Sequence, residues 1–209
     1  MLEMPVLLSA AALMGSQIVS IGPQNAFILR QGLARSHILP IIVICIVCDV
    51  LLVSLGVLGL GRVLNSVPGL IAGITLTGAG FIAWMGYRSL LSSLKPRRGD
   101  LSGAVERDRR TVIRTVLAVT LLNPYVWLDT VVIIGGLSAA YGPTGRVSFL
   151  IGSLLASALW FCTLGGLSGF LARWFEHPAN WRILDGAIAC IMFATAISLL
   201  VRSGLPGWI

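Results

Sequence analysis

The sequence predicts an all-α membrane protein with six transmembrane helices, and three observations support this fold class. First, 56% of the 209 residues are hydrophobic and only 11% are charged, whereas about a quarter of the residues in a typical soluble domain are charged. Second, the mean hydropathy is +0.93. Third, apolar runs of about 20 residues, the length that crosses a bilayer, recur along the chain. So little charge cannot cover a water-facing surface, and we therefore expect a single transmembrane transporter domain, residues 1–209.

Short segments with charged residues or helix breakers separate the six predicted spans. The segment RQGLARSH follows the first span, and GRVLNSVPG separates the second from the third. Each span has 19 to 25 residues, enough to cross about 30 Å of hydrocarbon at about 1.5 Å per residue. The predicted spans are Val6–Leu29, Ile38–Leu60, Leu70–Leu91, Val116–Leu137, Val147–Leu171 and Ile183–Val201.

One polar segment, residues 95–114, divides the chain into halves of three spans each, residues 1–94 and 115–209. Transporters are often built from two such repeats, and an odd number of spans per repeat makes the halves inverted relative to each other. The first span of each half carries a proline break, Gly22-Pro23 in one and Asn123-Pro124 in the other. We therefore expect two inverted three-helix repeats.

The distribution of basic residues predicts the orientation in the membrane. Twelve of the fifteen Lys and Arg residues fall in the first, third and fifth loops or at their edges, eight of them around the central segment. By the positive-inside rule these loops are cytoplasmic and both termini lie outside. The net charge of +7 is explained by these loops facing anionic lipid, so we expect no binding to nucleic acid.

Two acidic residues stand out from the other six, which lie in loops or at span ends. Asp185 is one of those six and is predicted in the first turn of the last helix, where an acid favours the helix dipole. Asp49 and Asp129 instead lie within the second and fourth spans. An aspartate at the centre of a membrane helix costs about 2.5–3.5 kcal/mol on insertion scales and marks function by default. The alternative is a structural aspartate that is hydrogen-bonded or protonated.

No Lys or Arg lies deep in any predicted span, so an incoming cation can serve as the partner of these acids. The two proline breaks supply complementary groups, because proline lacks an N–H and leaves a carbonyl without its helical partner. Side-chain amides at the breaks both donate and accept. Together these groups suit a zwitterion, although a kink with locally satisfied amides would leave the same pattern. The residues of the breaks are Gly22, Pro23, Gln24, Asn25, Asn123 and Pro124.

The second break lies close to one of the two buried acids. Asp129 follows Pro124 by five residues, or about 7.5 Å along a straight helix, which is near the length of a basic amino-acid side chain. Tyr125 and Trp127 sit beside this break, where they can line a cavity. We interpret the remaining Trp residues inside or near the spans, and Tyr87, as belt or packing residues. They are Trp84, Tyr87, Trp160, Trp174 and Trp181.

A competing interpretation is metal transport. Cys45, Cys48 and Asp49 form the sequence CIVCD, and thiolates with a carboxylate can bind a soft metal. No histidine joins them, because His37 and His177 lie at span ends, and buried cysteine usually behaves as a small hydrophobic residue. We find no nucleophile–base pair, phosphate loop or cofactor motif, so we expect no enzymatic activity, no cofactor and no resident metal.

Two motifs resemble the signatures of the lysine/arginine exporter family, which includes LysE and ArgO and is related to the RhtB exporters. They are SIGPQNAFILRQG in the first span and LLNPYVWLDTVVIIGG in the fourth. The CDVLL around Asp49 and the YGPTGR after the fourth span are also similar. The related homoserine and threonine exporters tend to carry Gly-Pro-Gly-Pro where this chain has Gly-Pro-Gln-Asn. One departure is Leu121, where family members often have tryptophan.

The resemblance implies secondary export of L-lysine or L-arginine across the bacterial inner membrane, driven by the membrane potential or a proton gradient. It also implies a role for the residues of both breaks and for Asp129 and, less directly, Asp49. Export of neutral amino acids or homoserine remains the main alternative. The partners expected are the lipid bilayer, a basic amino acid and a coupling proton or cation, and the sequence leaves a homodimer open.

Overall fold

Every regular element in the computed structural model is a helix across the residues that it describes, which are 2–18, 22–60, 66, 69–94, 108–171, 174 and 177–202. Within these residues, three helices are long and apolar enough to cross a membrane, or four when one bent pair counts as a single span. The predicted all-α membrane class is confirmed. The count of six spans stays a prediction.

The first predicted span consists of two helices, α1 (Met4–Ile18) and α2 (Pro23–Leu33), which are bent by 78° relative to each other. Helix α2 begins where the sequence predicts a break, because Pro23 occupies its first turn and Gly22 before it has extended backbone. Proline is favoured at a helix start, since its missing N–H would have no partner there. The break therefore marks the start of a new helix and not only a kink.

The next two predicted spans correspond to helices with similar bounds. Helix α3 (Ile38–Leu55) continues into the π-helical segment η1 (Gly56–Leu60), so the two together have the predicted bounds. Helix α5 (Leu70–Leu94) is three residues longer than predicted. Residues 95–107 of the polar segment, the predicted cytoplasmic loop, lie outside the described residues.

The fourth predicted span is also interrupted, because α6 ends before Asn123 and the helical conformation resumes at Pro124. Helix α6 (Arg109–Leu121) begins inside the polar segment because Asp108 caps it, accepting a 2.9 Å hydrogen bond from the Thr111 N–H. The Thr111 hydroxyl and N–H bonds hold the pKa of Asp108 below its ordinary value. After Leu122 and Asn123 the chain continues as a series of short helices. These are α7 (Pro124–Val126), the π-helix η3 (Trp127–Ile134), α8 (Gly135–Ser138) and the 3-10 helix η4 (Ala139–Tyr141).

The last two helices are longer than predicted, which corrects one assignment. Helix α9 (Gly142–Leu171) starts at Gly142, whose φ of 64° favours glycine. Helix α10 (Pro178–Arg202) starts five residues before the predicted span. Asp185 therefore lies two turns inside α10 and is fully buried, so the prediction that it sits in the first turn was wrong. The first residues of α10 include polar ones, so the apolar pattern used for the prediction does not extend to the start of the helix.

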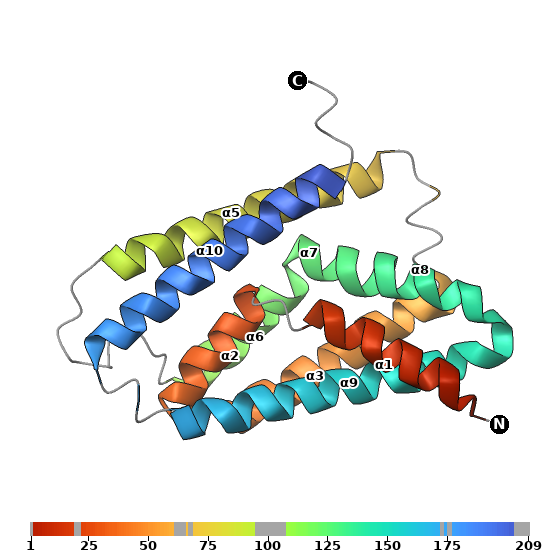
Figure 1. Ribbon diagram of the computed structural model, residues 1–209, viewed down its shortest axis with the longest axis horizontal. Helices are drawn as coiled ribbons and strands as arrows, with labels where there is room; N and C mark the ends of the chain where they lie inside the picture. Colours follow the sequence, from red (N-terminus) through yellow and green to blue (C-terminus); the bar gives the residue numbers. More distant parts are fainter. Residues whose placement is uncertain are drawn as a thin grey trace.

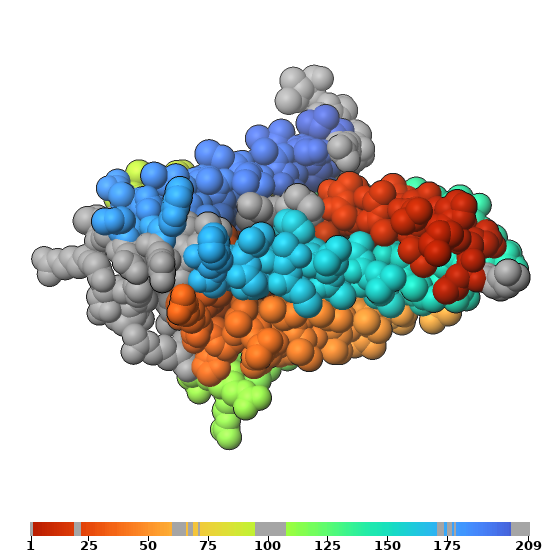
Figure 2. Space-filling model, turned by 60° about the horizontal axis from the view of Figure 1, so that its bottom comes forward, coloured from red at the N-terminus to blue at the C-terminus, as the bar shows by residue number. Residues whose placement is uncertain are grey.

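Successive long segments run back and forth along the molecule (Figure 1). Helices α5 and α10 pack against each other along their length, and we call them the outer pair. The remaining helices form an inner bundle, in which α9 contacts α1, α2 and α3, and α3 contacts α6 and η3. Figure 2 shows α1 (red) lying along α9 (cyan) on one face of this bundle.

One end of the molecule carries most of the described arginines, and we call it the basic end. It is the end where α2 finishes and where α6 and α10 begin, on the left in Figure 1. The start of α6 projects from the surface there in Figure 2. Its arginines include Arg30, Arg35, Arg109, Arg110, Arg114 and Arg182.

The two π-helical segments meet at a pair of glycines inside the inner bundle. A Cβ on Gly135 would lie 2.5 Å from the Cα of Gly56, and a Cβ on Gly56 would lie 2.9 Å from the carbonyl oxygen of Val131. Small residues allow helix backbones in a membrane to approach this closely. This contact joins η1, which follows Asp49 on α3, to η3 and α8, which carry and follow Asp129.

Replacing Gly135 by alanine is therefore expected to destabilise the fold, because the new methyl group meets backbone and not a movable side chain. The neighbouring Gly136 is the matched control, since a Cβ there meets no atom within 4 Å. In the detergent-solubilised protein, Gly135→Ala should lower the melting temperature, while Gly136→Ala should leave it unchanged or raise it, because alanine favours a helix by up to about 1 kcal/mol. Equal stability of the two variants would contradict the close contact.

Candidate functional site

A cavity lies where the two helix breaks meet inside the inner bundle. The space between its lining residues is about 510 Å³, which includes a part that is open to the outside. Eight of the nine residues singled out from the sequence line it. They are Gly22, Pro23, Gln24, Asn25, Asp49, Asn123, Tyr125 and Asp129. Pro124 starts α7 beside the cavity but is not among its lining residues.

At the first break, the side chain of Asn25 joins the two helices. Its Nδ2 donates a 2.8 Å hydrogen bond to the carbonyl of Ile18 at the end of α1, and its Oδ1 accepts a 3.3 Å bond from Trp160 Nε1 on α9. Asn25 is only 6% exposed. Trp160, predicted to be a belt or packing residue, is thus a hydrogen-bond partner of the break. The interpretation of a locally satisfied amide holds for Asn25.

Gln24 differs from its neighbour. Its Nε2 is buried and makes no well-formed hydrogen bond to a described residue, and the weakly accepting Cys45 thiol lies beside the Gln24 side chain. A buried amide nitrogen that is left unpaired is unfavourable, so this donor is available to a carboxylate or carbonyl that enters the cavity. Gly22 and Pro23 line the cavity beside it.

At the second break, as at the first, an asparagine side chain and a tryptophan N–H form hydrogen bonds beside the interrupted helix. Asn123 Oδ1 accepts a 3.1 Å hydrogen bond from the Tyr125 N–H and so caps α7. Trp127 Nε1 donates a 2.8 Å bond to the carbonyl of Leu121 at the end of α6. Trp127 therefore satisfies the broken backbone and is not a lining residue of the cavity, whereas Tyr125 is one. Each break presents a helix start to the cavity, and at the second break the Tyr125 and Val126 N–H groups are bonded to Asn123.

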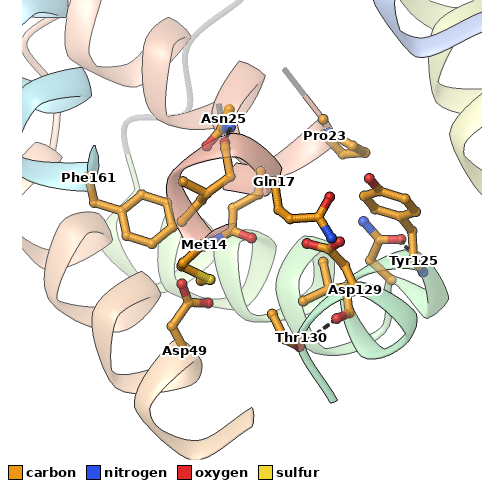
Figure 3. Close-up of a pocket in the computed structure, with 14 residues that line it drawn as sticks. Met14, Gln17, Pro23, Asn25, Asp49, Tyr125, Asp129, Thr130 and Phe161 are labelled. Carbon is orange, nitrogen blue, oxygen red and sulfur yellow. Dashed lines mark hydrogen bonds between the residues drawn. The ribbon is translucent and has the colours of Figure 1, made fainter. Parts of the chain in front are cut away.

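The two acids predicted from the sequence face the same cavity from different helices. Figure 3 shows Asp49 on α3 and Asp129 on η3, with Met14 and Gln17 of α1 beside them. Asp49 is 3% exposed and accepts a 2.5 Å hydrogen bond from Ser157 Oγ on α9. Asp129 is 8% exposed. It accepts no hydrogen bond from the residues that the structure describes.

The lining residues that the structure describes include no lysine, arginine or histidine. Two carboxylates therefore share a buried space without a cation from the protein. In a low-dielectric interior, such a pair attracts a cation strongly. The cavity therefore favours a cation beside Asp49 and Asp129, and the N-termini of α2 and α7 lie next to it.

The position of Asp129 differs from the straight-helix expectation. Residues Trp127–Ile134 form a π-helix, and Thr130 Oγ1 donates a 2.5 Å hydrogen bond to the carbonyl of Val126 within it (dashed line in Figure 3). A π-helix is wider than an α-helix and changes the direction of the side chains that follow. The rise of about 7.5 Å estimated for a straight helix therefore does not describe this segment. Such π segments occur frequently at functional sites.

Some residues of the site were missed by sequence reasoning. Gln17 carried a usable signal, because it is the only side chain of α1 that bears an amide, in a helix without charged residues. Ser157 and Thr130 carried none, since hydroxyl residues are common along this chain and often bond their own helix. Met14 and Phe161 complete the apolar wall of the cavity, and both are about 1% exposed.

The cysteine interpretation receives no support from the geometry. Cys45 and Cys48 are buried on α3, and no group of three or more His, Cys, Asp or Glu side chains that could hold a metal ion occurs among the described residues. The two cysteines thus behave as packing residues. Cys162 and Cys190 are exposed on α9 and α10.

Comparisons with known proteins bear on the whole chain. The chain is 36% identical over 204 residues to the arginine exporter protein ArgO of Yersinia enterocolitica, covering 96% of this chain and 98% of that protein. It is 34% identical to ArgO of Serratia proteamaculans over 196 residues, covering 93% of this chain and 95% of that protein. ArgO of Pectobacterium atrosepticum is 33% identical over 195 residues, covering 93% and 96%.

No solved structure matches the chain. The sequence pattern of the LysE type translocator family, in contrast, matches residues 16–203, which include both breaks and both acids of the cavity. The family resemblance seen in the two motifs is confirmed. The chain is a multi-pass membrane protein that belongs to the LysE type translocator family.

Proposed function

We propose that this protein is a secondary exporter of cationic amino acids, L-arginine, L-lysine or both. The observation that carries the proposal is the pair of carboxylates, Asp49 and Asp129, in one cavity without a basic side chain among its described lining residues. A guanidinium or ammonium group supplies the missing positive charge. The similarity to arginine exporters supports the same substrate class.

The helix breaks would hold the backbone of the amino acid. Its carboxylate is a ligand for Gln24 Nε2, at a place where the N-terminal ends of α2 and α7 attract anions through their helix dipoles. Its side chain then extends toward Asp129. Substrate sites of transporters commonly form at discontinuous helices in this way.

Six membrane crossings in two inverted halves are consistent with the packing. Helix α1 of the first half packs on α9 of the second, and α6 of the second half packs on α3 of the first. Helices α3 and α9 contact each other, as do α5 and α10. This reciprocal set of contacts is what a pseudo-two-fold axis between residues 1–94 and 115–209 would produce, and alternating access would arise by movement of one set of helices against the other.

In the bacterial inner membrane, the basic end would face the cytoplasm and both termini would lie outside. Export against a gradient requires an energy source, and antiport of a proton or the membrane potential would supply it. Cargo and proton would compete for the two carboxylates.

The proposal is tested by efflux from loaded proteoliposomes that contain the purified protein. Arginine, lysine, canavanine, homoserine and cadmium are compared, with protein-free vesicles as the control. We expect efflux of the basic amino acids and canavanine only. Efflux of homoserine alone would indicate a neutral substrate. Cadmium efflux that disappears in the Cys45→Ser, Cys48→Ser variant would indicate metal transport.

A further inference from the structure

An ion pair at the basic end joins the inner bundle to the outer pair. Arg30 Nη2 on α2 lies 2.7 Å from Asp185 Oδ1 on α10. Ser92 Oγ on α5 donates a 2.7 Å hydrogen bond to Asp185 Oδ2, and Arg30 Nη2 also lies 3.4 Å from Ser89 Oγ. The Asp185 side chain is 0% exposed and that of Arg30 is 27% exposed. The contact therefore has one buried partner and one that is partly exposed at the basic end.

Arg30 and the cavity share the same short helix. Pro23 and Gln24 line the cavity at the start of α2, and Arg30 lies two turns later on it. No residue of the outer pair is among the described lining residues of the cavity. The outer pair instead holds α2 from outside, through the ion pair and through Ala26, which packs in a cluster with Ile188 and Met192 of α10.

In the second half, the contact between the outer pair and the helix break is formed by close backbone packing and, among the described residues, not by an ion pair. The outer pair meets the second break where Gly78 of α5 approaches Tyr125, whose backbone N would lie 3.1 Å from a Cβ on the glycine. Arg30 lies seven residues after Pro23 of the first break. The residue seven after Pro124 of the second break is the apolar Val131. Asp185 lies seven residues after the first residue of α10, and the residue seven after the first residue of α5 is the uncharged Thr77. A charged contact is thus present at the basic end and has no counterpart at these positions.

A charged contact that water can reach is suited to repeated breaking. When Arg30 leaves Asp185, its guanidinium is hydrated at the aqueous end, and water that follows it reaches the buried carboxylate. Close backbone packing, as between Gly78 and Tyr125, has no comparable hydrated alternative. Separation of α2 from the outer pair would therefore occur at the basic end and would open a route along α2 toward the cavity.

We propose that the Arg30–Asp185 pair is a gate that closes the cavity toward the basic end and that opens once in each transport cycle. The inference rests on the proposed transport function for its role in the cycle. Arg30 and Asp185 act as positioning residues for α2, since neither lines the cavity. Ser92 holds the carboxylate of Asp185 in place for the pair.

The test measures how fast a cavity cysteine reacts from each side of the membrane. Met14→Cys provides the reporter, because Met14 lines the cavity and is 1% exposed. It is placed in a background whose native cysteines, Cys45, Cys48, Cys162 and Cys190, are replaced by alanine. A membrane-impermeant thiol reagent is added to inside-out or right-side-out vesicles, and labelling is normalised to folded protein.

Arg30→Gln is expected to raise labelling from the basic end by roughly tenfold or more, because the closed state loses its charged contact, and to lower net transport. The double variant Arg30→Asp, Asp185→Arg should restore slow labelling. Arg182→Gln is the matched control, since it removes a 2.8 Å bond to the Ser93 carbonyl inside the outer pair, and it should change neither readout.

Unchanged labelling in Arg30→Gln, or a folded charge-swap variant that labels as fast as Arg30→Gln, would overturn the gate. The labelling assay uses no amino-acid substrate, so it separates the two proposals. If the wild-type protein exports no basic amino acid but its labelling still depends on the ion pair, the gate stands and the proposed substrate is wrong.

Discussion

Replacement of Asp129 by asparagine is expected to abolish export of basic amino acids while leaving a folded, inserted protein. The side chain keeps its size, and no hydrogen bond from a described residue is lost, because Asp129 accepts none. What is lost is the negative charge that faces the cavity. Removing one partner of a buried charge pair typically costs about 2–5 kcal/mol, which corresponds to a loss of on the order of 30-fold or more in substrate affinity.

The measurement is arginine and lysine efflux from loaded proteoliposomes, with the amount of folded protein determined by size-exclusion chromatography. Asp108→Asn is the matched control, because it makes the same substitution at an exposed helix cap and asparagine is an equally good cap. That control should export normally. Wild-type efflux in Asp129→Asn would remove this acid from the mechanism and leave it a structural residue.

Replacement of Asp49 by asparagine is expected to separate cargo exchange from uphill export. A basic amino acid carries one net positive charge, so two ionised carboxylates beside it leave one negative charge buried, and a proton or cation must balance it. Asp49 is the more enclosed acid and is held by Ser157 of α9. Asparagine resembles its protonated form. Exchange of labelled for unlabelled arginine should persist, while export against a gradient falls to the background of protein-free vesicles.

Two assays on the same vesicles give this result. Counterflow measures exchange without a driving force, and efflux under an imposed proton gradient or membrane potential measures coupling. Ser157→Ala is a milder control, since it removes the hydrogen bond to Asp49 but keeps the carboxylate, and it should weaken coupled export without eliminating it. Loss of both exchange and efflux in Asp49→Asn would instead assign Asp49 to cargo binding.

Eight residues of the cavity could be found from the sequence because each belongs to a segment that carries a local signal. A proline without an N–H must interrupt a helix at Pro23 and Pro124, and an acid within an apolar span is unfavourable unless it has a purpose. These signals need no knowledge of what lies nearby in space. They led to eight residues that the fold gathers around one cavity.

Features that depend on distant contacts could not be predicted. Arg30 and Asp185 are separated by 155 positions, and neither looks unusual near the end of its apolar run. The start of α10 at Pro178 was missed because apolarity marks the part of a helix that faces lipid, not where the helix begins. The π-helix at Asp129 likewise depends on its packing against η1, where Gly135 meets Gly56.

The pairing of α1 with α9 bears on how the protein is made. The Glu3 backbone N–H bonds the Ser148 hydroxyl across 145 positions, and Leu7 packs its backbone on Gly152. At about 5–20 residues per second of synthesis, the ribosome needs roughly 7 to 30 seconds to supply these partners after α1 emerges. During that interval the polar break at Gly22 cannot have its final neighbours. The nascent first half must therefore be sheltered by the insertion machinery or by lipid headgroups until α9 arrives.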